Sequence, residues 1–307
     1  MKKNVIKTLF ASLIIFILGI VICIISFIYS KVSNIDLFKN NDVSPGESYE
    51  IEISMVEKTG QSTLDKIYIS AENTDISILS TEKESYILFE NPDSEKTECK
   101  IENGILKISD TVPFYFMGLS VKNHKYEFAG FRNIFSQGIY SKTNKKITVF
   151  LNKNLPIELI NISVGVGDIN ISDLNIQELT VISSVSGIAI TNSDIQNTVS
   201  INNKIGNIVF EGCNCIFADI NGKIGDIKAS ASGRKTNCET VLGDISIATE
   251  NDYTDYSSRA SLSYGKIYLN GDINENKQYS NNIESDKSLW TKTSVGNISF
   301  YKTVTNE

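Results

Sequence analysis

The chain has 307 residues, of which 41% are hydrophobic and only four are proline, so it can bury a sizeable core and extensive disorder is excluded. Residues 1–30 hold three lysines and no acidic side chain, which leaves 26 Lys and Arg against 36 Asp and Glu in the remainder, a net charge of −10. Such an acidic remainder argues against nucleic acid or anionic lipid as a partner.

The N-terminal residues predict a membrane anchor. Three lysines within residues 1–8 precede an apolar run over 9–29, which would be about 31 Å long as a helix and could cross a bilayer. The position of the lysines favours a cytoplasmic N-terminus and a single-pass protein of the cell membrane, whose remainder is extracellular after a linker over 30–47. A cleaved signal peptide is the alternative, although its apolar region is normally only ~7–15 residues long.

A short motif recurs through the C-terminal half of the chain. It reads apolar–Gly–x–Ile–x–apolar and begins at residues 166, 185, 205, 224, 242, 264 and 295, so successive starts lie 19, 20, 19, 18, 22 and 31 residues apart. A weaker copy, TDISIL, stands at 74–79. The glycine and isoleucine positions that define the repeat are Gly167, Ile169, Ile188, Gly206, Ile208, Gly225, Ile227, Gly243, Ile245, Gly265, Ile267, Gly296 and Ile298.

A period of about 19 residues that holds short strands and no helical pattern is typical of a β-solenoid. The predicted fold is therefore all-β, a single-stranded, parallel β-helix-like solenoid preceded by one transmembrane helix. Each repeat would be one coil stacked on the one before, with isoleucines filling the interior and glycines at a crowded corner. We expect the coils over 146–307, strands that cap one end over 48–110, and an insertion near 270–289 on the flank of the stack.

The residue between glycine and isoleucine is polar or glycine in every copy, and Asp, Asn and Gly all suit a tight turn. On this interpretation Asn207→Ser is nearly silent. The alternative is a cation site, in which Asp226 and Asp244 on adjacent coils share an ion such as Ca²⁺. The glycine-rich nonapeptide of calcium-binding solenoids is absent, and no cofactor site is expected.

The segment 111–145 interrupts this pattern with aromatic residues. Eight of the 28 aromatic side chains and the single histidine, His124, lie within 112–140. The segment is either a plug packed on the first coils or an exposed surface that contacts membrane, glycan or protein. The candidate contact residues are Phe114, Tyr115, Phe116, Phe128 and Phe131.

Four cysteines lie outside the apolar run: Cys99, Cys213, Cys215 and Cys238. One bridge could join Cys238 to Cys213 or Cys215, while buried thiols are the simpler interpretation. The sequence contains no HExxH, no GxSxG and no cysteine–histidine set, so we expect no catalytic residues and no enzymatic activity. A glycan-active enzyme is the less favoured alternative.

The segments IYIS, TDISIL and GILKIS, the stretch KKITVFLNKNLPIELINISVGVGDINI and the later G-[DN]-I copies resemble the bacterial putative-adhesin, β-strand-repeat family of unknown function, which includes LiaG-like cell-envelope proteins. The likeness runs over about residues 48–301. It implies a cell-surface β-solenoid with an adhesive or envelope-stress role, and it offers no catalytic residues to carry over. We expect a non-catalytic binding or scaffold module whose partners are cell-wall glycan or envelope proteins. The alternative is an accessory of envelope-stress signalling that acts through membrane partners.

Overall fold

The computed structural model describes residues 48–53, 64–92, 96–111, 114–116, 119–122, 125–128, 140–141, 145–231 and 233–303. Two compact units are present, of which the larger comprises Val43–Phe114, Val121–Lys125 and Thr143–Glu307. No helix in these described ranges is long and apolar enough to cross a membrane. The predicted span over 9–29 and the linker over 30–47 lie outside the described residues.

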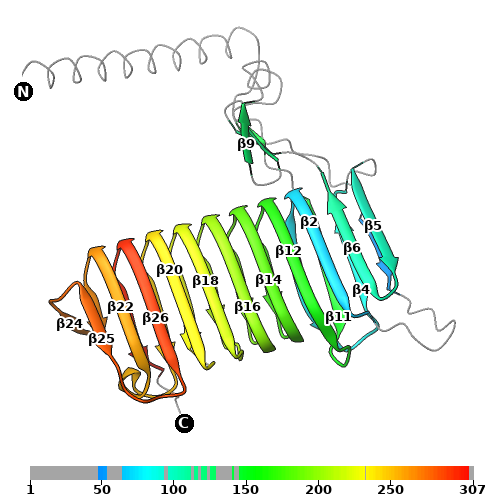
Figure 1. The fold of residues 1–307 in the computed structure, drawn as a ribbon. Coiled ribbons are helices and arrows are strands. Elements are labelled where there is room, and N and C mark those ends of the chain that lie inside the picture. The colour runs from blue at the N-terminus through cyan, green and yellow to red at the C-terminus, as the bar shows by residue number, and fades with distance from the viewer. Residues whose placement is uncertain are drawn as a thin grey trace, which may run out of the picture. The chain divides into compact units, whose positions relative to one another are not determined.

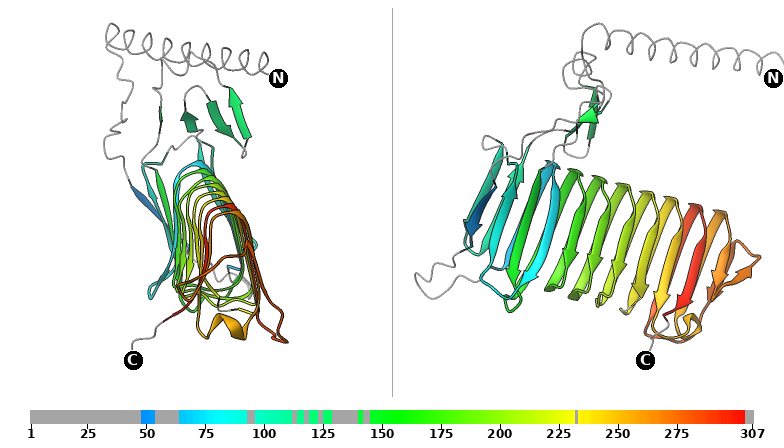
Figure 2. Two further views of the ribbon diagram at one scale, coloured as in Figure 1. Left: turned by 90° about the vertical axis from the view of Figure 1, so that its left-hand side faces the viewer. Right: turned by 180° about the vertical axis from the view of Figure 1, so that it is seen from behind.

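The larger unit is an all-β solenoid made of two sheets (Figure 1). Sheet A has 12 strands and sheet B has 11, and a typical coil contributes a longer strand to sheet B and then a shorter strand to sheet A. Viewed along the stack, the coils of this unit overlie one another (Figure 2). Five coils follow chain order: β12 (Ile157–Val166) with β13 (Ile169–Ser172), β14 (Asn175–Val185) with β15 (Ile188–Thr191), β16 (Asp194–Ile205) with β17 (Ile208–Glu211), β18 (Phe217–Ile224) with β19 (Ile227–Ala231), and β20 (Lys235–Leu242) with β21 (Ile245–Thr249).

The first coils are out of chain order. Strands β2 (Lys66–Asn73) and β3 (Asp75–Thr81) form a complete coil that pairs with β12 and β13 on one side. On the other side they pair with β6 (Ile105–Asp110) and β11 (Lys146–Asn152), which together make the outermost coil. The weak TDISIL copy is therefore a full member of the stack, and the solenoid includes much of the region expected to be its cap.

The last coils are exchanged in the same way. Strands β26 (Ser288–Val295) and β27 (Ile298–Lys302) lie between the β20–β21 coil and the coil of β22 (Ser257–Tyr264) and β23 (Ile267–Leu269). The expectation that each repeat stacks on the one before it is thus wrong at both ends, because matching copies of the motif do not specify which slot a coil fills.

Antiparallel strands cover both ends of the stack. At the N-terminal end these are β1 (Tyr49–Glu52), β4 (Tyr86–Glu90) and β5 (Thr97–Glu102). At the other end, β24 (Asp272–Asn274) and β25 (Gln278–Asn281) are the outermost strands of the two sheets. The insertion near 270–289 was expected on the flank, but it covers the terminal coil, where unpaired strand edges would otherwise invite association.

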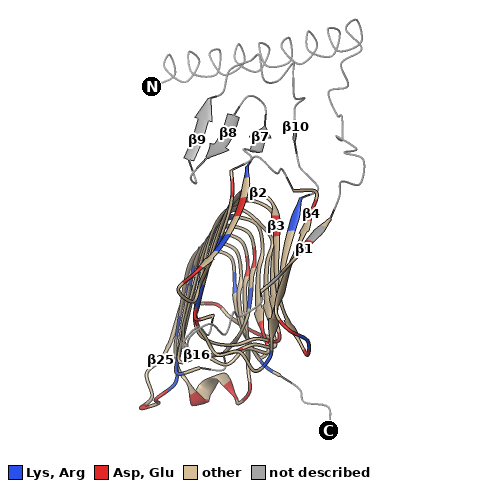
Figure 3. Cartoon of the chain, turned by 90° about the vertical axis from the view of Figure 1, so that its right-hand side faces the viewer, with Lys and Arg blue, Asp and Glu red and all other residues tan. Residues whose placement is uncertain are grey.

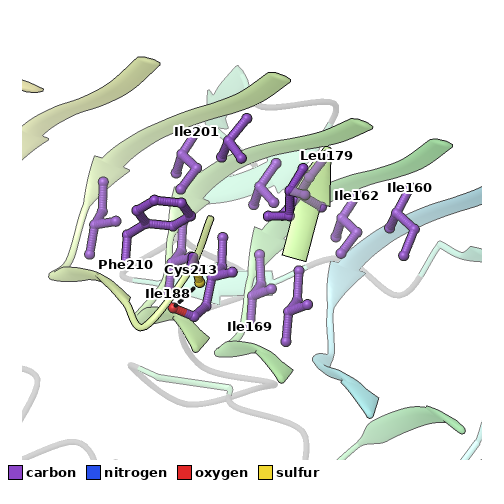
Figure 4. Packing of buried hydrophobic residues seen from close by; sticks show 14 of the residues in the cluster. Ile160, Ile162, Ile169, Leu179, Ile188, Ile201, Phe210 and Cys213 are labelled. Atoms are coloured by element: carbon purple, nitrogen blue, oxygen red, sulfur yellow. Dashed lines mark hydrogen bonds between the residues drawn. The ribbon is translucent and has the colours of Figure 1, made fainter. Parts of the chain in front are cut away.

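The interior is built from ladders of apolar residues that repeat from coil to coil (Figure 4). The isoleucine that opens each sheet A strand faces its counterpart on both neighbouring coils, and all nine are at most 2% exposed. Each such burial stabilises the fold by roughly 1.5–3 kcal/mol. In stacking order the ladder is Ile147, Ile76, Ile169, Ile188, Ile208, Ile227, Ile245, Ile298 and Ile267.

Candidate interaction surfaces

The two sheets meet along two long edges, and one of them is formed by the repeat motif. There six coils pass from sheet B to sheet A through a glycine and one polar residue, while the β14–β15 coil uses Ser186 and Gly187 and the β2–β3 coil uses Thr74 alone. We call this the glycine edge. The glycines at 167, 206, 225, 243, 265 and 296 have φ between 122° and 149°. A Cβ on any of them would collide with a main-chain carbonyl oxygen of the adjacent coil, so these six positions have no room for a side chain. Ser186 and Thr74 stand at the equivalent position of two other coils.

Buried polar side chains support the same edge from inside. Asn203 donates from Nδ2 to the carbonyl oxygen of Ser186 at 2.8 Å. The hydroxyls of Thr240 and Thr293 donate to the carbonyl oxygens of Gly225 and Gly243 at 3.2 and 3.1 Å. These bonds satisfy corner carbonyls that the strand ladders leave free, since a buried acceptor without a partner is costly.

The polar residue after each glycine bonds to the next coil. Asn207 accepts through Oδ1 from the main-chain N–H of Asp226 at 2.9 Å, and Asp226 accepts in the same way from Asp244 at 2.8 Å. The series continues through Asn297 and ends at the N–H of Lys266. The turn preference behind the expected near-silence of Asn207→Ser does not include this bond between coils, and that expectation stays a prediction.

The candidate cation pair lies within this series. Asp244 accepts from Asn297 through both oxygens, at 2.6 Å from N and 3.4 Å from Nδ2, while Asp226 uses Oδ1 for Asp244. Within the described ranges no group of three or more His, Cys, Asp or Glu side chains is placed to hold a metal ion. Calcium binding at Asp226 and Asp244 stays a prediction.

The first residue of each motif forms an exposed apolar ladder. Its members face one another in register along the outside of the glycine edge. Exposure rises along the stack, from 6% at Val166 to 40% at Ile205 and 73% at Tyr264. Sequence reasoning missed this surface, since an apolar residue in a strand is expected to face the core. The apolar edge ladder consists of Val166, Val185, Ile205, Ile224, Leu242, Val295 and Tyr264.

The outer face of sheet B carries an ordered polar array. Most of the ribbon of the larger unit is uncharged, with single charged residues interspersed (Figure 3). A second row beside the first contains Ser163, Asn202, Asn221 and Glu239, interrupted by the exposed Ile182. Glu239 pairs with Lys292 at 2.7 Å. In register order, the first row is Asn161, Thr180, Ser200, Asp219, Asn237, Trp290 and Arg259.

The four described cysteines form no disulfide. The Cys213 thiol lies 3.5 Å from the carbonyl oxygen of Ile190 and 3.3 Å from that of Glu211, and it donates to both (Figure 4). Burial raises the pKa of Cys213 to about 11 and that of Cys215 to about 12, and it raises the pKa of Cys238 further. These thiols remain protonated at neutral pH, so they are poor nucleophiles and poor metal ligands.

The aromatic insertion departs from the glycine edge of the outermost coil, where it replaces the two-residue turn. Its base is tied by a buried ion pair, in which Lys145 Nζ lies 3.4 Å from Asp110 Oδ1. Thr74 donates its hydroxyl hydrogen to the other carboxylate oxygen of Asp110. The two ends of the insertion are therefore held together by charge and hydrogen bonds instead of by a glycine.

The insertion contains a separate sheet in the order β10-β7-β8-β9. Its strands are β7 (Phe114–Phe116), β8 (Leu119–Lys122), β9 (Lys125–Phe128) and β10 (Tyr140–Ser141). Phe114, Tyr115 and Phe116 lie on β7 and Phe128 ends β9, whereas Phe131 is outside the described residues. Whether these rings form a plug or a contact surface stays a prediction.

Comparison with known families shows to which protein family this two-sheet solenoid belongs. The profile of the family described as Toastrack DUF4097 matches residues 31–299, which is most of the chain. The chain belongs to the Toastrack DUF4097 family. This agrees with the resemblance to adhesin-like β-repeat proteins of unknown function that the G-[DN]-I copies carry. No curated protein matches this Toastrack chain.

Several solved structures resemble this Toastrack chain. A "putative adhesin" from Bacteroides fragilis shares 15% identity, with coverage of 83% of this chain and 96% of its own and a TM-score of 0.46. A "putative cell adhesion protein" from Clostridium sporogenes shares 13%, with coverage of 84% and 99% and a TM-score of 0.36. A "Putative lipid binding protein" from Parabacteroides distasonis shares 20%, with coverage of 82% and 96% and a TM-score of 0.37.

Proposed function

We propose that this Toastrack protein is a non-catalytic binding module, held outside the cell by its N-terminal segment, which attaches to cell-wall glycan through the outer face of sheet B. The observation that carries the proposal is the first polar row on that face, which runs in register from Asn161 to Arg259. Parallel coils repeat its hydrogen-bonding groups at about 4.8 Å, a spacing that suits an extended polymer more than a compact ligand.

The C-terminal part of this row has the chemistry that sugars require. Trp290, the single tryptophan of the chain, lies between Asn237 and Arg259, and Asp219 is next in line. The indole offers a flat apolar surface for a sugar ring, while the amide, carboxylate and guanidinium offer donors and acceptors for its hydroxyls. The N-terminal run over 9–29 would hold this face outside the membrane.

The test is co-sedimentation of the full chain, in detergent, with purified peptidoglycan sacculi. We expect retention of the parent chain and loss of most retention in Trp290→Ala. The matched control is Tyr268→Ala, which removes a partly exposed aromatic ring from β23 in sheet A and should leave retention unchanged. Equal retention of the parent and Trp290→Ala would overturn the assignment of this face.

Two further outcomes of the same test would redirect the proposal. Release of soluble sugar fragments from the sacculi would show catalysis and contradict a pure binding role. Crosslinking in the intact envelope that recovers a membrane protein and no glycan would favour the envelope-stress role that the family resemblance implies.

A further inference from the structure

The apolar edge ladder places several exposed apolar side chains next to one another, instead of a single one. Ile205, Ile224, Leu242, Val295 and Tyr264 are 40% to 73% exposed and lie on five successive coils. Val241, next to Leu242, is 45% exposed and widens the strip. A continuous exposed apolar surface of this kind usually marks a contact with protein or membrane.

The path of the chain indicates what this strip meets. Tyr49 lies opposite Phe89, and Glu90 lies opposite Lys146, so the described chain begins at the same edge where β11 begins. The last described strand is β27, whose last residue Lys302 lies at the opposite edge of sheet A. The 18 residues of 30–47 that join Tyr49 to the predicted span extend to at most ~60 Å. The segment that would lead to a membrane anchor therefore joins the solenoid at the glycine edge.

The charges beside the strip are balanced, so its attraction to a membrane would not depend on anionic lipid. Lys223 precedes Ile224 on the sheet B side. Lys266 follows Gly265 in the β22–β23 coil. The carboxylates of Asp226 and Asp244 lie on the sheet A side and accept main-chain N–H groups of neighbouring coils. Tyr264, the most exposed member, combines an apolar ring with a hydroxyl, as side chains at a membrane interface commonly do.

We propose that the apolar edge ladder rests on the outer surface of the lipid bilayer, so that the solenoid lies along the membrane with its glycine edge inserted among the head groups. This inference rests on the proposed membrane anchor, and it goes beyond the proposed glycan-binding role. The outer faces of both sheets would then stand away from the bilayer and remain open to ligands.

The test uses tryptophan quenching by brominated acyl chains in the full protein, reconstituted into phosphatidylcholine vesicles. Trp290→Phe first removes the single native tryptophan. One reporter is Leu242→Trp in the strip, and the matched control is Phe217→Trp, because Phe217 is 48% exposed at the other end of its strand. Tyr264→Trp is a second reporter, conservative in size, in case Leu242→Trp disturbs the fold.

We expect Leu242→Trp and Tyr264→Trp to lose most of their emission in brominated vesicles and Phe217→Trp to lose almost none. Reporters in the strip that are quenched no more than Phe217→Trp, in a chain that floats with the vesicles, would overturn the inference and leave the anchor intact. A chain that fails to float would contradict the anchor itself. A blue shift without quenching would show that a second protein copy covers the strip, which also overturns lipid contact.

Discussion

The glycine edge and the opposite edge join the same two sheets under different constraints. At the glycine edge each of the seven motif turns has two residues, and in six of them the main chain of the adjacent coil comes so close to the glycine that a Cβ would collide. At the opposite edge, which we call the loop edge, the turns vary from two residues at 173–174 to seven at 250–256. Asp173 and Asn192 adopt positive φ there, so this edge accepts side chains in the left-handed region.

This difference indicates where the family can vary. The register of the stack is set at the glycine edge, where one turn length and one series of hydrogen bonds repeat from coil to coil. The unequal motif spacings of 18 to 22 residues arise from strand length and from the loop edge. Insertions are therefore compatible with the loop edge, whereas at the glycine edge the insertion over 111–145 needs a buried ion pair at its base.

The largest expected effect comes from breaking the ladder next to the glycine edge. Ile208 is 1% exposed between Ile188 and Ile227, and Ile208→Asp would bury a carboxylate among apolar side chains. We expect it to lower the free energy of unfolding by more than about 4 kcal/mol, enough to unfold the chain. Val209→Asp, at the neighbouring outward position, is the control. Urea titration followed by circular dichroism measures the unfolding midpoint of each variant. Equal midpoints would contradict the assignment of Ile208 to the interior and Val209 to the outer face.

The next effect tests the contrast between the edges directly. Gly225 has a φ of 137° and no room for a Cβ, whereas Gly271 follows β23 with a φ of 92° and nothing within 4 Å. Gly225→Ala should cost about 2–4 kcal/mol, since backbone strain and a main-chain collision add together. Gly271→Ala should cost only about 1 kcal/mol from its φ. Thermal unfolding compares the stability of the two variants. A larger loss of stability in Gly271→Ala would contradict the conclusion that the glycine edge is the more constrained one.

A smaller effect is expected from one rung of the hydrogen-bonded series. Asn207→Ala removes the acceptor that the N–H of Asp226 uses, and this should cost about 1 kcal/mol. Asn170→Ala, an exposed change on the outer face of sheet A, should be silent. Denaturant midpoints decide the point, and an unchanged midpoint for Asn207→Ala would show that water replaces the bond fully. Gly187 already leaves one rung without a side chain, so the series tolerates a single gap.

The last effect is absent at neutral pH and appears only as the pH becomes alkaline; it originates at the loop edge. Unfolded thiols titrate near pH ~8.5, whereas the pKa of Cys215 is about 12 in the fold. Between these values only the unfolded chain loses the proton, so the free energy of unfolding falls as pH rises, by up to about 1.4 kcal/mol per pH unit for each thiol. Urea titrations at rising pH should show this decline, and Cys215→Ala should make it shallower. An identical slope in the variant would contradict the assigned burial.

The sequence predicts those features of the fold that depend on neighbouring residues, and it does not predict those that depend on contacts between coils. Ile169 and its equivalents are predictable because strand alternation points them inward, and Gly167 is predictable because one corner repeats. The position of β26 and β27 between two earlier coils is not predictable, since their motif matches that of the neighbouring coils. Leu242 was assigned no outward role, because alternation alone would place it inside. In the structure, the strand runs past the interior before it turns.

The exchanged order of the end coils also determines what a shortened chain can do. Strands β26 and β27 are the last described strands in chain order, and they fill a slot between two coils that precede them in sequence. A chain truncated before Ser288 therefore yields a stack with a missing rung instead of a shorter stack. Its terminal coil would have no neighbour to pair with, and both sheets would be open at the gap. The presence of β26 and β27 thus becomes a condition for closing the fold, so copies that lack them carry unpaired strand edges that quality-control proteases can recognise.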